Sequence, residues 1–168
     1  MNPMGGTVLS YNPTGPVVVG SDGSPHARRA MLFALREAQL RQTSLRVVCA
    51  YDLFSTAGRY LDYRYMALME TDGTIYEQLR DTAMQAMADM VEETGQELGG
   101  SNVEVKILAE QGRPAEVLLA ASDGACLLVV GSRGAGIWGR LTLGSTSTEV
   151  VHHAHLPVTV VPPPGPGT

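Results

Sequence analysis

The chain has 168 residues, of which 44% are hydrophobic, and a formal net charge of -5 with a pI near 5.3. This length suits one domain with a sizeable core and leaves little room for a second. The negative charge argues against general binding to nucleic acid or to anionic membranes, since neither surface would attract the protein at long range.

No apolar run approaches the length of a membrane span, and residues 1–14 contain neither a basic nor an apolar segment. We therefore expect a soluble cytoplasmic protein without a secretion signal and without a membrane partner. Cys49 and Cys126 both lie in apolar, strand-like runs and belong to no CxxC pair. They are typical of buried free thiols in a reducing compartment, and a redox pair is the alternative.

The hydrophobic pattern predicts strands and helices that alternate along the chain. Residues 1–15 have no periodicity and are expected to form a flexible leader, and residues 163–168, rich in Pro and Gly, a disordered tail. The pattern also fails between Tyr51 and Ile75, where a connection could cover a site, mediate an interface or form an ordered surface loop. The expected strands are residues 16–20, 45–50, 103–109, 126–130 and 157–161. One helix is expected to begin at Pro25, and three further helices are expected over residues 76–98, 113–121 and 145–153.

This alternation predicts an α/β fold: one domain over residues 16–162, with a doubly wound parallel sheet and helices on both faces. Common strand orders for such sheets are 3-2-1-4-5 and those that contain 2-1-3, and we expect 3-2-1-4-5. In that order the winding reverses beside the first strand, where open sheets bind ligands. The turn that carries Asp22 and the loop that starts at Gly131 would then face one another across the crevice.

The segment from Cys126 to Val161 carries the clearest functional signal. An apolar strand is followed by a glycine-rich loop and then by a helix start rich in hydroxyl groups. Ser145 or Thr146 could cap this helix, and Glu149 stands where a capping box from Thr146 would place it. Free backbone N–H groups and the positive end of the helix dipole make such a junction an anion site. The loop glycines are Gly131, Gly134, Gly136 and Gly139.

Two well-known nucleotide signatures fit this loop only in part. Gly134 to Gly139 satisfies G-x-G-x-x-G, but the next helix starts too late and no acidic residue follows about 20 positions on. The P-loop pattern fails because Arg140 and Leu141 occupy the positions of the phosphate-binding lysine and the magnesium-binding hydroxyl. Hydrolysis of the P-loop type is therefore disfavoured.

A third signature fits without adjustment. The spacing Gly131-x2-Gly134-x9-Gly144-Ser145 is the ATP-binding motif of the universal stress protein family, which the chain resembles over roughly residues 16–162. This resemblance implies the Rossmann-like fold shared with adenine nucleotide alpha hydrolases. Residues 17–25, 111–116 and 155–161 are also similar to the first strand and turn, the third helix start and the closing strand of that family.

The resemblance also implies the residues of a nucleotide site. Asp22, with the backbone of Gly20 and Ser21, would contact the ribose or a magnesium ion bound to the phosphates. Ala50 would line the adenine pocket, and Arg133 could pair with phosphate or remain a solvated loop arginine. The residues that would hold the phosphates are Gly131, Gly134, Gly144 and Ser145, with donors from Thr146 and Ser147.

The function that the resemblance implies is binding of ATP, together with Mg²⁺, in stress response or nucleotide-linked signalling, with at most slow hydrolysis. No Ser-His, Cys-His or paired-carboxylate arrangement can be recognised around Asp22, so no catalytic residue is assigned. A homodimer through the edge strand Pro157–Val161 is also implied. Two alternatives stay open: cyclic AMP or AMP in the same pocket, and a scaffold protein that needs no nucleotide.

Three histidines near the end of the last helix suggest a metal site, but no carboxylate or thiolate nearby completes the ligands. Histidine is also favoured at a helix C-terminus by the helix dipole. We therefore expect no metal held by protein side chains alone. Trp138, in the middle of the glycine loop, could cover a ligand, contact a partner or anchor the loop. The histidines are His152, His153 and His155.

Overall fold

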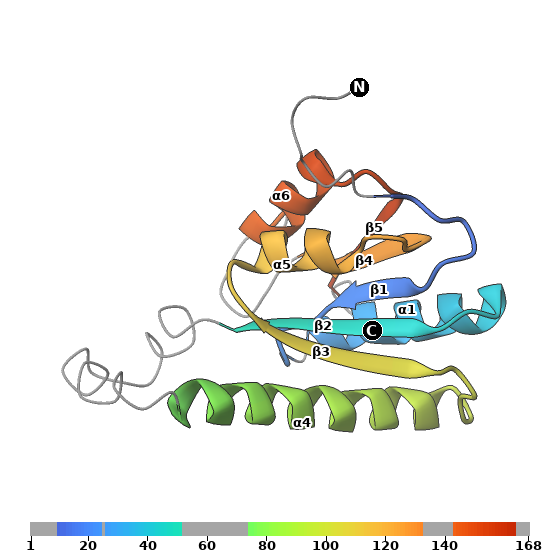
Figure 1. Cartoon of the computed structure of the whole chain (residues 1–168). Helices are drawn as coiled ribbons and strands as arrows, with labels where there is room; N and C mark the ends of the chain where they lie inside the picture. Colours follow the sequence, from blue (N-terminus) through green and yellow to red (C-terminus); the bar gives the residue numbers. More distant parts are fainter. Residues whose placement is uncertain (1–9, 25, 52–73, 133–142, 164–168) are drawn as a thin grey trace.

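The computed structural model describes residues 10–24, 26–51, 74–132 and 143–163. Strands and helices alternate along these residues as predicted (Figure 1). The ends of the predicted elements agree with the observed ones to within two residues. The elements are β1 (Val17–Gly20), α1 (Ala27–Arg41), β2 (Leu45–Tyr51), α4 (Thr74–Glu97), β3 (Val105–Gln111), α5 (Pro114–Ala121), β4 (Leu127–Gly131), α6 (Ser145–His153) and β5 (Val158–Val161).

The strands form one parallel sheet in the order β3-β2-β1-β4-β5, which confirms the predicted order. β1 lies in the centre and pairs with β2 and with β4. Its residues Val17, Val18 and Val19 are fully buried, since helices cover both faces of the sheet here. A continuous run of β-branched residues is typical of a strand in this position. The sheet order places the carboxyl ends of β1 and β4 side by side.

Two hydrophobic cores lie on opposite faces of the sheet. On one face, α1 and α4 cover Val17 and Val19, with Met31 and Met87 fully enclosed. On the other face, α5 and α6 cover the alternate residues, among them Val18. Because successive strand residues point to opposite faces, each central strand contributes to both cores. The predicted arrangement, with helices on both faces, is confirmed.

Residues 10–15, which belong to the predicted leader, are attached to the domain. The Ser10 N–H donates to Oδ1 of Asp123 at 2.7 Å, and the Gly124 N–H donates to the Ser10 carbonyl at 2.8 Å. The Asn12 N–H donates to the Ala125 carbonyl at 3.2 Å. These bonds satisfy backbone groups of the turn between α5 and β4, so the folded unit extends to Ser10. The sequence pattern missed this because the contacts are made by the backbone and have no hydrophobic period.

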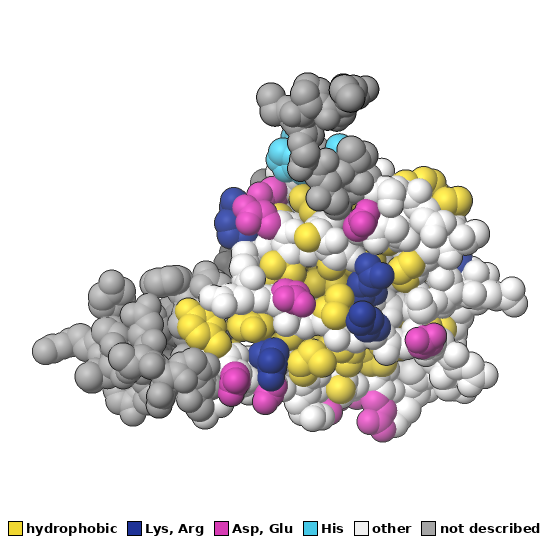
Figure 2. Space-filling view, in the orientation of Figure 1, with side chains coloured by type: hydrophobic (Ala, Val, Ile, Leu, Met, Phe, Trp, Pro, Cys, Tyr) yellow, Lys and Arg dark blue, Asp and Glu magenta, His cyan; other side chains and the backbone are white. Residues whose placement is uncertain are grey.

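Cys49 and Cys126 are both buried and free, as predicted. None of the helices in the described residues is long and apolar enough to cross a membrane. On the face drawn in Figure 2, the Lys and Arg side chains of the described residues lie among acidic and apolar ones and form no continuous basic surface.

Candidate functional site

β1 leaves the sheet at Ser21 and enters a tight turn. The Ser21 N–H donates to the Val48 carbonyl at 3.0 Å, which extends the pairing with β2 by one bond. Oδ1 of Asp22 accepts from the Ser24 N–H at 3.0 Å and closes an Asx turn. Gly23 has a φ of 73°, a conformation that glycine adopts without steric cost. The turn therefore holds Asp22, which is exposed, at the carboxyl edge of the sheet.

The side chain of Ser21 is directed into the protein. Its Oγ lies 3.7 Å from the sulfur of Met90 on α4 and accepts from the Gly23 N–H at 3.3 Å. Ser21 is only 8% exposed. Since its N–H and its hydroxyl are both engaged, a ligand contact by Ser21 would come from its carbonyl.

The backbone of Ala50 faces the place where β1 leaves the sheet. The Val48 carbonyl accepts from Ser21 beside β1, and the Tyr51 carbonyl accepts from the Gly112 N–H beside β3 at 3.1 Å. In a parallel strand the backbone groups of successive residues point to alternate neighbours, so those of Ala50 point to the β1 side. The last residue of β2 that is in register with β1 is Val48, opposite Gly20. Ala50 thus lies beyond the paired part of β1, where a ligand could reach its backbone.

Gly131 has the matching orientation on the other side of β1. The Leu128 N–H donates to the Pro157 carbonyl at 3.0 Å and the Ser132 N–H to the Val161 carbonyl at 2.8 Å, both toward β5. By the same alternation, the N–H and carbonyl of Gly131 are directed to the β1 side. The structure therefore brings Asp22, Ala50 and Gly131 to one edge of the sheet, although they come from three different strands.

The start of α6 lies at this edge as well. The first intrahelical bond runs from the Thr148 N–H to the Gly144 carbonyl at 2.9 Å. The N–H groups of Ser145, Thr146 and Ser147 precede that bond, and helix geometry provides them with no intrahelical partner. Together with the helix dipole, they make the end of α6 suited to an anion such as phosphate.

Among the described residues, the Ser132 carbonyl ties α6 to the end of β4. The Gly144 N–H donates to the Ser132 carbonyl at 2.8 Å. The Ser147 hydroxyl lies 3.2 Å from the same oxygen and 3.0 Å from the Gly144 carbonyl. Ser147 is 2% exposed, so its hydroxyl serves this attachment, and its backbone N–H is the group that faces the helix end. The sequence pattern assigned no role to Ser132, although this residue stands between two glycines of the motif.

The predicted caps of α6 were wrong. The N-cap residue is Gly144, and it makes no side-chain capping bond. Ser145 is the first helical residue, one position too late to cap. Glu149 binds Arg113 of the β3–α5 turn instead of closing a capping box with Thr146. The sequence spacing is compatible with a capping box, but α6 packs beside α5, and this brings the Glu149 carboxylate to the Arg113 guanidinium group.

Gly20 has a packing reason to be glycine. A Cβ at this position would lie 2.8 Å from both Cδ atoms of Leu118 on α5. Since Leu118 is 5% exposed, it has little room to move away. The absence of a side chain at Gly20 therefore lets α5 pack closely on β1.

The charge of Asp22 reaches Cys49 on β2. Burial, and secondly the negative charge of Asp22, raise the pKa of the Cys49 thiol to about 11. Cys49 is therefore a protonated, buried thiol at neutral pH and is not suited to nucleophilic chemistry.

Arg133 and Gly134, as well as Trp138 and most of the connection from Tyr51 to Ile75, lie outside the described residues. Within the described ranges, no three His, Cys, Asp or Glu side chains come together as metal ligands.

A parallel sheet with helices on both faces and a strand order that reverses beside β1 defines a Rossmann-like α/β protein. The chain matches the universal stress protein family model over residues 14–162, and it therefore belongs to the universal stress protein family. It is 34% identical over 148 residues to a universal stress protein of Mycolicibacterium smegmatis, with 86% of this chain and 47% of that protein covered. It is 37% identical over 147 residues to one from Thermus aquaticus, with 86% and 96% covered.

The chain thus spans about half the length of the mycobacterial relatives that it matches. Among solved structures, the universal stress protein UspA from Lactobacillus plantarum has a TM-score of 0.66 at 22% identity, with 90% of this chain and 99% of that chain covered, which shows the shared fold. A universal stress protein in complex with cAMP has a TM-score of 0.58 at 25% identity, with 88% and 95% covered. One from Archaeoglobus fulgidus in complex with dAMP has a TM-score of 0.53 at 22% identity, with 88% and 97% covered.

Proposed function

We propose that this chain binds ATP, together with Mg²⁺, at the carboxyl edge of the sheet and acts in stress response or nucleotide-linked signalling with little or no turnover. The observation that carries the proposal is that the Asp22 turn follows the end of β1, while the first turn of α6 is bonded to Ser132 just after the end of β4, the strand beside β1. The first supplies a carboxylate suited to a ribose or a magnesium ion, and the second supplies backbone donors suited to phosphate.

The residues fit an adenine nucleotide in chemical type. The phosphates would be held by Gly131 and Gly144 and by the N–H groups of Ser145, Thr146 and Ser147, with Arg133 and Gly134 of the motif as further partners. The adenine would lie against the backbone of Ala50, since adenine has both donor and acceptor edges. Each helix-end contact contributes only about 0.3–1 kcal/mol, so the affinity must come from many donors together.

A second candidate ligand is cyclic AMP or AMP in the same pocket. The complex of a 25% identical universal stress protein with cAMP favours it. The pocket would then hold one phosphate at α6, and Mg²⁺ would add little. A scaffold role without nucleotide is the outcome in which none of these ligands binds.

The test is to denature the purified protein, identify any released nucleotide, and titrate the nucleotide-free protein with ATP, AMP and cyclic AMP by calorimetry, with and without Mg²⁺. We expect ATP to bind most tightly and Mg²⁺ to strengthen its binding. Tighter binding of cyclic AMP or AMP would favour the second candidate. No released nucleotide and no heat with any ligand would refute both.

A glycine variant checks the location of the site. Gly144 has φ -64° and ψ 163°, a conformation open to any L-residue, so Gly144→Val should fold. Its side chain would occupy the space that phosphate approaches and should abolish ATP binding, and Gly131→Val should do the same. The control is Gly95→Ala on α4, where a Cβ has 3.9 Å to its nearest neighbour. Unchanged ATP affinity in Gly144→Val would place the site elsewhere.

We also propose a homodimer through β5. Within the described residues this strand pairs with β4 on one side and forms an edge of the sheet. A free edge invites pairing with another chain, and a second copy would protect it. Light scattering of Val161→Lys, compared with the wild type, tests this assembly. A variant with the wild-type mass would refute the β5 interface.

A further inference from the structure

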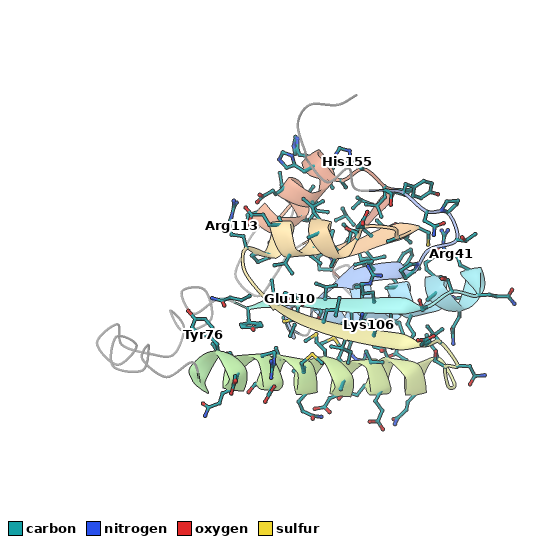
Figure 3. The ribbon with its side chains drawn as sticks, viewed as in Figure 1. Arg41, Tyr76, Lys106, Glu110, Arg113 and His155 are labelled. Atoms are coloured by element: carbon teal, nitrogen blue, oxygen red, sulfur yellow. The ribbon has the colours of Figure 1, made fainter. Side chains whose placement is uncertain are left out.

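Arg113 lies at the same edge of the sheet as the candidate site, but the proposed nucleotide contacts do not use it. Its Nη1 lies 2.8 Å from Oε1 of Glu116, and its Nη2 lies 3.1 Å from each carboxylate oxygen of Glu149. Since Glu149 is the middle residue of α6, the second contact joins the start of α5 to the middle of α6. Figure 3 shows Arg113 at the start of α5, and Figure 2 shows basic and acidic side chains together at this end of the two helices.

The backbone holds Arg113 in a defined place. The Gly112 N–H extends the pairing of β3 with β2 through its bond to Tyr51, and Gly112 has a φ of 147° that favours glycine. Pro114 follows at the first helical position, and the Arg113 carbonyl accepts the Val117 N–H at 3.0 Å. The guanidinium group therefore extends from the junction of a strand and a helix, which are both parts of the core.

α6, by contrast, is a short helix that packs on the core through Val150 and has few polar attachments within the described residues. It has nine residues, of which Ser147 and Val150 are buried. Its first turn is tied to Ser132 at the end of β4, as described above. The contact of Glu149 with Arg113 is a second attachment, about 6 Å further along the helix axis from Ser145. Two attachments at different points restrict the tilt of a helix more than one does.

We propose that Arg113 is a positioning residue for the phosphate end of the nucleotide site. By holding Glu149, it keeps the first turn of α6 aimed at the phosphates and raises the affinity for phosphorylated nucleotides. This inference rests on the proposed nucleotide binding. Because Arg113 acts through α6, the binding of adenosine, which has no phosphate, does not depend on it.

The test compares the affinities for ATP and adenosine in the wild type, Arg113→Ala, Glu149→Gln and the double variant, by calorimetry. Ion pairs of this exposure are worth little, so each single variant should weaken ATP binding by about two- to fivefold. The double variant should be no weaker than the worse single variant, because both changes remove the same contact. The affinity for adenosine should be unchanged in all four proteins.

Arg41→Ala is the matched control. Arg41 pairs with Glu37 at 3.0 Å and is half exposed, but it lies at the opposite end of the sheet from Arg113 (Figure 3). Its loss should leave both affinities unchanged. A wild type that binds neither ligand would refute the nucleotide site itself. If the wild type binds, three results overturn the role of Arg113: an unchanged affinity of Arg113→Ala for ATP, an equal loss for adenosine, or tighter ATP binding by Glu149→Gln.

Discussion

Replacing Gly20 by alanine separates packing from ligand binding at the candidate site. The new Cβ would lie 2.8 Å from both Cδ1 and Cδ2 of Leu118 and 3.4 Å from its Cγ. Carbon atoms in contact are normally about 3.5–4.0 Å apart, so the Leu118 side chain or α5 must shift by several tenths of an ångström. Leu118 packs among Val18, Val48 and Ala115 in a closed core, where such overpacking costs about 1–3 kcal/mol.

Urea and thermal denaturation measure this cost. For a chain of 168 residues, each kcal/mol lowers the melting temperature by about 2–4 °C. Adding Leu118→Val to Gly20→Ala should cost less than the two single changes together, since the shorter side chain relieves the clash. The ATP affinity of the folded Gly20→Ala variant should stay within about twofold of the wild type, because the methyl group is directed at α5. A variant as stable as the wild type, or one that loses ATP affinity without losing stability, would refute the packing role.

Three smaller changes test other parts of the structure. Gly95→Ala should raise the free energy of unfolding by about 0.5–1 kcal/mol in urea denaturation, because alanine favours the helix and the new Cβ meets no close neighbour. A free energy of unfolding below that of the wild type would show that the methyl group does not fit. The pKa of Cys49 is raised from 9.0 to about 11, so the thiol loses its proton at lower pH in the unfolded chain than in the folded one. The stability of the wild type relative to Cys49→Ala should therefore fall between about pH 9 and pH 11. A stability difference between the two proteins that stays constant over this pH range would show that the thiol is not buried. The hydrogen bonds from Ser10 lower the pKa of Asp123 below 3.8. In thermal melts, the higher melting temperature of the wild type relative to Asp123→Asn should therefore be fully present above pH 3.8 and disappear as the pH falls through the lowered pKa. A difference in melting temperature that does not depend on pH would contradict the hydrogen bond from Ser10 to Asp123.

Local sequence signals predicted the elements that position the site. Both ends of α6, Ser145 and His153, were predicted correctly, because Gly144 precedes the helix and Pro157 follows it. The apolar run in residues 16–20 predicted the first strand, which the structure confirms as Val17–Gly20, with Val17, Val18 and Val19 fully buried. Once strands and helices alternate, the handedness of the crossovers and the preferred strand orders leave few arrangements, so Asp22 and Gly131 could be assigned to one edge.

The cap of α6 could not be predicted in the same way. Ser145, Thr146 and Glu149 satisfied the spacing of a capping box, and the actual N-cap is Gly144. A cap depends on the backbone conformation of one residue at the helix start, and here the bond to the Ser132 carbonyl sets that conformation. Propensity rules describe the average helix start and do not include such a partner.

The sequence by itself determined the alternation of strands and helices, limited the sheet to a few strand orders and indicated the edge at which Asp22 and Gly131 meet, because period, turn chemistry and chain handedness act over short distances. Only the tertiary structure decided the side-chain partners at that edge. Glu149 pairs with Arg113, 36 residues away. Gly20 makes room for Leu118, which comes from another element. Such partners depend on how closely two packed elements approach, and no spacing within one segment contains that distance.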